Sequence, residues 1–255
     1  MRRTGEVFAA SLGGVLWILA AAAYGGLVGV LLPRAAYRLS VEPEDGWRDR
    51  CPDGHPVGRW TGPARCGECA PPGRYGPPTA PVAAATALLC SGVAAATGPH
   101  AELAVWLVAV PVGLLLGLVD VAVRRLPDML TLPLAGAVLA LLGAVRLAAG
   151  PGAGTWPGAL LGAVALGGFY LLLVLVNPDG MGFGDAKLAV AIGAALGWYG
   201  WDVLLAGAFL GLLLGAVYGV GLMVVRRAGR KESIPMGPFM LAGAYAALLL
   251  GAAGA

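Results

Sequence analysis

Residues 156–176 read WPGALLGAVALGGFYLLLVLV, a run of 21 residues without a charged side chain. A helix needs about 20 apolar residues to cross the hydrocarbon core of a bilayer. The whole chain shares this character, since 58% of its 255 residues are hydrophobic, 12% are charged and the mean hydropathy is +0.80. Soluble domains are about 45–50% apolar and about 25% charged. The composition therefore predicts a polytopic membrane protein and excludes a disordered chain.

Further apolar runs lie on both sides of this one. We expect an all-α membrane protein of about eight transmembrane helices, over Val7–Leu32, Val82–Thr97, Leu103–Val119, Leu130–Leu147, Trp156–Val176, Leu188–Gly200, Val203–Val225 and Phe239–Ala252. The first run follows two arginines, as in a signal peptide, but it exceeds the usual 7–15 apolar residues of such a peptide, so we expect a retained helix. One long polar connection, residues 33–81, carries seven arginines and three of the four cysteines.

The positions of lysine and arginine predict the orientation, because these residues are enriched in cytoplasmic connections. If segment 33–81 is cytoplasmic, 14 of the 17 basic residues lie inside. Those beyond the segment are Arg124, Arg125, Lys187, Arg226, Arg227, Arg230 and Lys231, and the three outside are Arg2, Arg3 and Arg146. Both chain ends then face outward. The net charge of +3 is too small to indicate a nucleic-acid partner, so membrane lipid is the expected surrounding.

Two acidic residues are expected at cytoplasmic helix ends. Asp120 closes the run 103–119, and Asp185 precedes the run 188–200. Ionisable groups at a bilayer are costly and are therefore functional candidates. Two neighbouring carboxylates can share a proton, so that one activates a water molecule while the other protonates a scissile carbonyl, as in aspartic peptidases. The alternative is that each acid is a solvated helix end, or that Asp120 pairs with Arg124.

Three motifs in this order resemble those of the prepilin peptidases, also called type IV leader peptidases. Residues 120–134, DVAVRRLPDMLTLPL, resemble the element around the first aspartate of that family; residues 182–188, GFGDAKL, resemble its G-x-G-D-x-K-L element; residues 234–239, IPMGPF, resemble its I-P-F-G-P-F segment. The resemblance implies that Asp120 and Asp185 are the catalytic pair. The residues that it implies in substrate binding or motif support are Gly182, Phe183, Gly184, Lys187, Pro127, Asp128, Pro235, Gly237 and Pro238.

The same resemblance implies an activity. Family members cut the short, positively charged leader from precursors of type IV pilins and secretion pseudopilins, on the cytoplasmic side of the cell's inner membrane. It implies a membrane aspartic peptidase domain over residues 101–255, which needs no cofactor for proteolysis, and an N-terminal region over residues 1–100.

The N-terminal region resembles the N-methyltransferase domain of the family. The similarity lies at residues 29–39 and at Arg74 and Tyr75, but Pro33 and Thr79 stand where the family has Asn and Glu. N-methylation of the new N-terminus, with S-adenosylmethionine as the methyl donor, therefore stays an open alternative.

The polar connection holds a second candidate site. Cys51 and His55 are followed by Cys66 and Cys69. A reducing cytoplasm disfavours disulfides, and this spacing predicts a structural zinc ion with three cysteines and one histidine as ligands. The alternative is a loop that binds no metal, because Gly54 stands where a regular CxxC pair would have its second cysteine. Cys90, inside a predicted helix, is expected to be a small buried apolar residue.

Two other functions remain alternatives. An intramembrane GxGD protease similar to presenilin or signal peptide peptidase would carry a Pro-Ala-Leu element near the end of the chain, where residues 235–239 read PMGPF. A cation transporter or scaffold without enzymatic activity would carry inverted repeats and acidic residues near the middle of the membrane, whereas both aspartates here are expected at helix ends.

Overall fold

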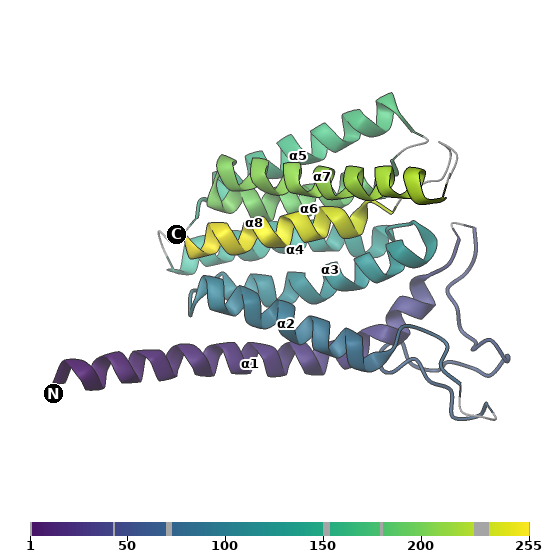
Figure 1. The fold of residues 1–255 in the computed structure, drawn as a ribbon, viewed down its shortest axis with the longest axis horizontal. Helices are drawn as coiled ribbons and strands as arrows, with labels where there is room; N and C mark the ends of the chain where they lie inside the picture. Colours follow the sequence, from purple (N-terminus) through teal and green to yellow (C-terminus); the bar gives the residue numbers. More distant parts are fainter. Residues whose placement is uncertain are drawn as a thin grey trace. The chain divides into compact units, whose positions relative to one another are not determined.

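The computed structural model describes residues 2–42, 44–69, 73–149, 154–178, 181–226 and 235–254. These residues form eight helices and no strands (Figure 1). The helices are α1 (Arg2–Leu39), α2 (Thr79–Thr97), α3 (Leu103–Val123), α4 (Asp128–Ala149), α5 (Trp156–Val176), α6 (Phe183–Tyr199), α7 (Trp201–Arg226) and α8 (Gly237–Ala253). Each expected apolar run falls on one of them, which confirms the all-α fold class. The expected start of α6 at Leu188 is wrong, because its first turn holds polar residues that a search for apolar runs leaves out.

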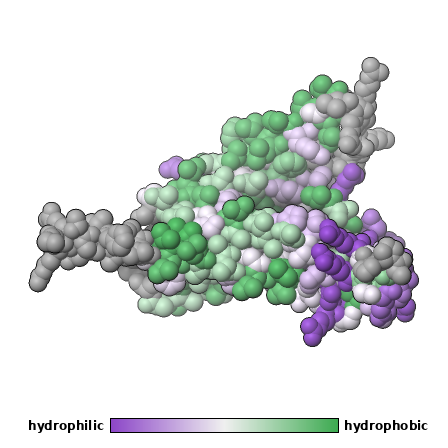
Figure 2. Space-filling view, turned by 60° about the horizontal axis from the view of Figure 1, so that its bottom comes forward, coloured by the Kyte–Doolittle hydropathy of each residue, from purple (hydrophilic) through white to green (hydrophobic). Residues whose placement is uncertain are grey.

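The surface of the helices is that of a multi-pass membrane protein. Six helices, α1 to α5 and α7, are long and apolar enough to cross a membrane, and α8 is an apolar helix of shorter length. Large apolar side chains such as Leu147, Leu175 and Val176 are exposed on the helices, and Figure 2 shows apolar residues over the helical faces and hydrophilic residues gathered on the connection between α1 and α2. Lipid, not water, is the solvent that suits this surface.

The chain divides into two compact units. The first contains Met1–Arg38 and Arg48–Pro111. In it α1 and α2 cross closely, since a Cβ atom on Gly25 would lie 2.6 Å from the Thr86 carbonyl oxygen and one on Gly29 would lie 2.7 Å from the Ala83 Cα. Such close crossings are typical of helix pairs in membranes.

The second unit contains Leu39–Trp47 and Val112–Ala255, and α6 lies at its centre. α6 contacts α4, α5, α7 and α8, and most of its residues are buried. Its closest neighbour is α5, where a Cβ atom on Gly197 would lie 2.5 Å from the Gly158 carbonyl oxygen. Because protein rather than lipid surrounds α6, its first turn can carry polar residues.

Candidate active site

Asp120 lies in the last turn of α3 and is 3% exposed. Its Oδ2 atom accepts a hydrogen bond of 2.9 Å from the backbone N–H of Gly237, the first residue of α8. The helix ends just beyond Asp120, whose carbonyl oxygen accepts the N–H of Arg124, and Arg124 has a φ of 53°. Asp120 is therefore a buried group at the N-terminus of α8, not a solvated helix end.

The lack of a side chain at Gly237 lets its backbone approach the Asp120 carboxylate closely. A Cβ atom there would lie 2.8 Å from Asp120 Oδ2 and 3.4 Å from Leu126 Cδ2. Pro235 precedes α8, and Pro238 lies in its first turn, where a proline fits because the N–H groups of a first turn have no partner within the helix. The residues around Gly237 thus start α8 directly at Asp120.

Asp185 occupies the first turn of α6 and is 8% exposed. Its Oδ2 atom accepts the backbone N–H of Gly182 at 3.0 Å, and its own N–H donates to the Gly182 carbonyl oxygen at 3.1 Å. This reciprocal pair satisfies groups that every helix start leaves open. Each of the two aspartates is therefore fixed by the backbone N–H of a glycine at a helix N-terminus, where negative charge is favoured.

Leu126 links the two aspartates. A Cβ atom on Gly184, the residue before Asp185, would lie 2.8 Å from Leu126 Cβ. Gly237, which binds Asp120, faces the Cδ2 atom of the same leucine. The two carboxylates also interact electrostatically. The chain thus brings together the two acids that are 65 residues apart in sequence.

An ion pair joins the starts of α4 and α6 beside the two aspartates. Lys187 Nζ lies 2.7 Å from Asp128 Oδ2, and Asp128 is the first residue of α4. Pro127, just before it, uses its carbonyl oxygen to accept the N–H groups of Leu130 and Thr131. Phe183, the first residue of α6, is 58% exposed. The remaining residues of the three motifs thus begin helices or connect them; Ile234 lies outside the described residues.

Two neighbours of this site did not emerge from the sequence. Leu126 belongs to the first motif, but the sequence assigned it no role, and only its contacts place it beside Gly184 and Gly237. Tyr170 of α5 is 1% exposed and interacts electrostatically with Asp185. Tyr170 is the only tyrosine in the apolar run of α5, which could have marked it as a candidate site residue. No local sequence pattern connects it to Asp185.

The cysteine segment of the first unit gathers Cys51, His55, Cys66 and Cys69, whose ligand atoms all lie within 4.8 Å of one another. The Sγ atoms of Cys51 and Cys69 are 3.7 Å apart, and His55 Nδ1 lies 3.5, 3.8 and 3.5 Å from the Sγ atoms of Cys51, Cys66 and Cys69. Tetrahedral zinc, with Zn–S bonds of about 2.3 Å and Zn–N bonds of about 2.0 Å, holds sulfur atoms about 3.8 Å apart and sulfur and nitrogen about 3.5 Å apart. The donor set therefore fits a metal ion of this kind.

Backbone groups support the four donors. The N–H of Cys51 donates to the His55 carbonyl oxygen at 2.9 Å, with Gly54 between them at a φ of +87°, a conformation that glycine adopts readily. The backbone N–H of Glu68 lowers the pKa of the Cys66 thiol to about 7, which favours the thiolate form that binds metals. Cys90 is buried in α2, as expected.

Comparison with known proteins gives the chain a family. Residues 107–220 match the model of the type IV leader peptidase family. The chain is 37% identical over 136 residues to a prepilin leader peptidase/N-methyltransferase of Aeromonas salmonicida (strain A449), covering 52% of this chain and 44% of the relative. It is 36% identical over 169 residues to the protein of that name from Aeromonas hydrophila, covering 65% and 56%.

A longer match extends into the N-terminal region. The chain is 31% identical over 235 residues to a prepilin leader peptidase/N-methyltransferase of Burkholderia pseudomallei (strain 1026b), covering 85% of this chain and 70% of the relative. The chain spans about half the length of the Aeromonas relatives. No solved structure matches it. From the length of the Burkholderia match, together with the match to the family model, we conclude that this chain belongs to the type IV leader peptidase family.

Proposed function

We propose that this protein is a membrane aspartic endopeptidase that removes the leader peptide from prepilin or pseudopilin precursors at the cytoplasmic face of the inner membrane. Asp120 and Asp185 are the catalytic residues, in a peptidase domain over residues 101–255. One observation carries the proposal: two buried carboxylates from distant motifs lie around Leu126, each fixed by a glycine N–H. Membership of the type IV leader peptidase family favours this function over the presenilin-like and transporter alternatives.

The chemistry follows from two carboxylates that share one proton. The ionised aspartate accepts a proton from a water molecule, whose oxygen attacks the scissile carbonyl, while the protonated aspartate donates its proton to the carbonyl oxygen. As the C–N bond breaks, the proton taken from water passes to the leaving amine, and a hydroxyl group of the gem-diol intermediate returns its proton to the other aspartate. The N–H groups of Gly182 and Gly237 hold the carboxylates in place during these transfers and reduce the reorganisation that the reaction requires.

Substitution of either aspartate tests the proposal. When the protein is co-expressed with a prepilin, Asp120→Asn and Asp185→Asn should each reduce cleavage by a factor on the order of 10³, because an amide cannot exchange the proton. Cleavage is followed by the shift in precursor size on a gel. Asp202→Asn is the matched control, since Asp202 is an exposed acid in the first turn of α7. Unchanged cleavage by both active-site variants would refute the mechanism.

We further propose that Cys51, His55, Cys66 and Cys69 bind a structural zinc ion. The fit of the donor distances to tetrahedral zinc supports this assignment. When bound, zinc supplies folding free energy to the polar connection, which has few helices or strands of its own to stabilise it.

Metal analysis of the purified protein tests the zinc site. The wild-type chain should contain about one equivalent of zinc, and Cys66→Ser should lose most of it, because a structural site requires all four ligands. Cys90→Ser is the control, since Cys90 is buried in α2 outside the cluster. A wild-type content below about a tenth of an equivalent would contradict the proposal.

The relatives are named as N-methyltransferases as well as leader peptidases. We propose that residues 1–100 form a degenerate version of the N-methyltransferase domain. Side chains of the matching motifs make contacts that hold this region together. Arg34 donates to the Tyr75 hydroxyl and to the Pro63 carbonyl oxygen, both at 3.0 Å, and the Tyr37 hydroxyl donates to the Arg50 carbonyl oxygen at 2.9 Å. These hydrogen bonds use the motif side chains for packing within the region.

A further inference from the structure

Tyr170 is a tyrosine of α5 whose side chain is only 1% exposed. Its ring meets the ring of Phe169 edge-on, with the two ring centroids 5.6 Å apart. The hydroxyl group has a different requirement, because a buried tyrosine O–H generally needs a hydrogen-bond partner. Among residues 157–176 no other side chain is polar. A side-chain partner for this hydroxyl must therefore come from another helix.

The crossing of α5 and α6 determines which residue of α6 lies opposite Tyr170. The two helices run antiparallel and meet through glycines that are four residues apart on each helix. These contacts join Gly158 to Gly197 and Gly162 to Gly193. Residues four apart lie along one ridge of a helix, and two further steps along these ridges lead to Tyr170 on α5 and to Asp185 on α6. The register of the crossing therefore pairs Tyr170 with Asp185.

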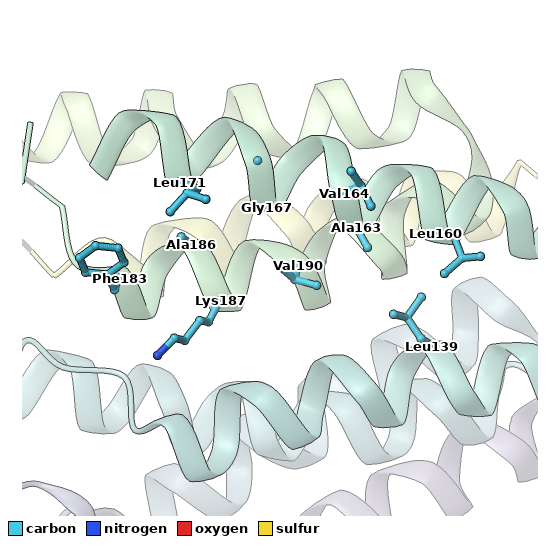
Figure 3. A pocket seen from close by; sticks show the side chains of 11 residues that line it. Leu139, Leu160, Ala163, Val164, Gly167, Leu171, Phe183, Ala186, Lys187 and Val190 are labelled. Carbon is cyan, nitrogen blue, oxygen red and sulfur yellow. The ribbon is translucent and has the colours of Figure 1, made fainter. Parts of the chain in front are cut away.

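Two further observations agree with this register. Figure 3 shows Leu171 and Ala186, the residues that follow Tyr170 and Asp185 in the sequence, side by side on α5 and α6. Both residues line the same apolar cavity. Tyr170 also interacts electrostatically with Asp185. Helix packing and electrostatics thus place the phenol group of α5 beside Asp185.

The Asp185 carboxylate can accept more than one hydrogen bond. Its two oxygens offer about four acceptor sites, and the Gly182 N–H donates to Oδ2 at 3.0 Å. A phenol, with an unperturbed pKa of about 10, stays protonated over the range in which an aspartate titrates. It can therefore donate to the ionised carboxylate without bringing a charge of its own, and such a donor favours the ionised form.

We propose that Tyr170 is a positioning residue that donates its hydroxyl hydrogen to the Asp185 carboxylate and keeps Asp185 ionised. The proposal rests on the proposed function. It assigns the two roles of the pair: Asp185 accepts the proton from the water molecule, and Asp120 gives its proton to the scissile carbonyl. Tyr170 keeps its own proton in every step. The phenol distinguishes two aspartates that are otherwise held alike, each by one glycine N–H.

The other titratable groups of the site stay in place when this hydroxyl is removed. Asp120 of α3 interacts electrostatically with Asp185. Asp128 of α4 forms its ion pair with Lys187 at 2.7 Å. Tyr218 of α7 is 45% exposed, and α8 carries no charged residue. A change in the pH profile on loss of the phenol hydroxyl alone can therefore be assigned to that hydroxyl.

The pH profile of cleavage tests the proposal, because a purely structural role would change activity equally at every pH. Tyr170→Phe keeps the ring, but the acidic limb of kcat/KM for a purified prepilin should move to higher pH by roughly one unit, the effect of one hydrogen bond to a carboxylate. The basic limb should move much less, because loss of the donor affects both ionised states of the pair. Tyr24→Phe is the matched control, since Tyr24 is exposed on α1. An acidic limb within about 0.2 units of wild type would overturn the proposal, whatever the activity.

A modified tyrosine provides a second measurement with the opposite sign. 3-Fluorotyrosine at position 170 keeps the hydroxyl and nearly the same size, and its more acidic phenol is a stronger donor. The acidic limb should therefore move to lower pH than in wild type, and this holds even if Tyr170→Phe fails to fold in detergent. An unchanged limb, or a move to higher pH, would contradict the role of Tyr170.

Asp185→Asn separates this failure from that of the proposed function. If Asp185→Asn abolishes cleavage while Tyr170→Phe keeps the wild-type pH profile, only the role of Tyr170 is wrong. Cleavage by Asp185→Asn at the wild-type rate would instead contradict the peptidase mechanism itself.

Discussion

Gly237 and Gly182 hold the two aspartates through backbone atoms rather than through side chains. A glycine N–H at a helix N-terminus can approach a carboxylate closely and stabilise its charge without adding a titratable group. The approach is closest at Gly237, where a Cβ atom would lie 2.8 Å from Asp120 Oδ2, inside ordinary van der Waals contact. At Gly182 a Cβ atom would lie 3.7 Å from Asp185 Oδ2. The requirement for glycine is therefore stricter on the Asp120 side.

This difference predicts the effect of Gly237→Ala. The added methyl group displaces the Asp120 carboxylate from the Gly237 N–H, and a shift of about 1 Å in a catalytic group can reduce turnover roughly a hundredfold. Turnover of a purified precursor by the variant measures this loss, with the thermal midpoint in detergent as a check of folding. Gly136→Ala on α4 serves as the control, since its Cβ atom meets nothing within 4 Å. Turnover within about twofold of wild type would show that the N–H contact is dispensable.

The helix α6 is largely buried among other helices. It has 17 residues and contacts α4, α5, α7 and α8. Its closest packing is against α5, where Gly158, Gly162, Gly193 and Gly197 let the two backbones meet. This crossing fixes the position of α6 and therefore of Asp185 in its first turn.

A bulky residue at the crossing should separate α5 from α6. In Gly197→Leu the Cβ atom would lie 2.5 Å from the Gly158 carbonyl oxygen, and rigid backbone cannot yield as a side chain does. We expect the free energy of unfolding to fall by about 1–3 kcal/mol, measured by denaturant titration in detergent, together with slower precursor cleavage. Gly221→Leu, in open surroundings on α7, should leave the stability near that of wild type. Equal stability of the two variants would contradict the crossing as a source of stability.

For the whole molecule, the charge distribution sets the expected direction in the membrane. Fourteen of 17 basic residues fall on one side if segment 33–81 is cytoplasmic, and such a bias orients membrane proteins during insertion. The same assignment puts Asp120 and Asp185 on the side where the leader of a precursor would be cut. Orientation and proposed function therefore depend on each other.

Protease accessibility checks this orientation. An epitope inserted at Gly46, an exposed position with nothing within 4 Å of its Cβ atom, should be digested in inverted membrane vesicles and protected in spheroplasts. An epitope placed after Ala255 should show the opposite pattern, because seven crossings are expected after segment 33–81 and an odd number of crossings puts the end of the chain on the other side of the membrane. Digestion of the Gly46 epitope in spheroplasts would reverse the orientation and remove the proposed cytoplasmic cleavage site.

The sequence alone determined what depends on local composition and spacing. The helices followed from apolar runs of membrane length, Asp120 and Asp185 from rare charges at the ends of such runs, and the cysteine and histidine cluster from ligand spacing. Only the tertiary structure decided which faces meet. It showed Leu126 between Gly184 and Gly237, and Tyr170 near Asp185. The physical reason is that α5, and α6 beyond its first turn, are apolar on all sides, so no periodic pattern marks a buried face. Close packing of small residues then selects the partners.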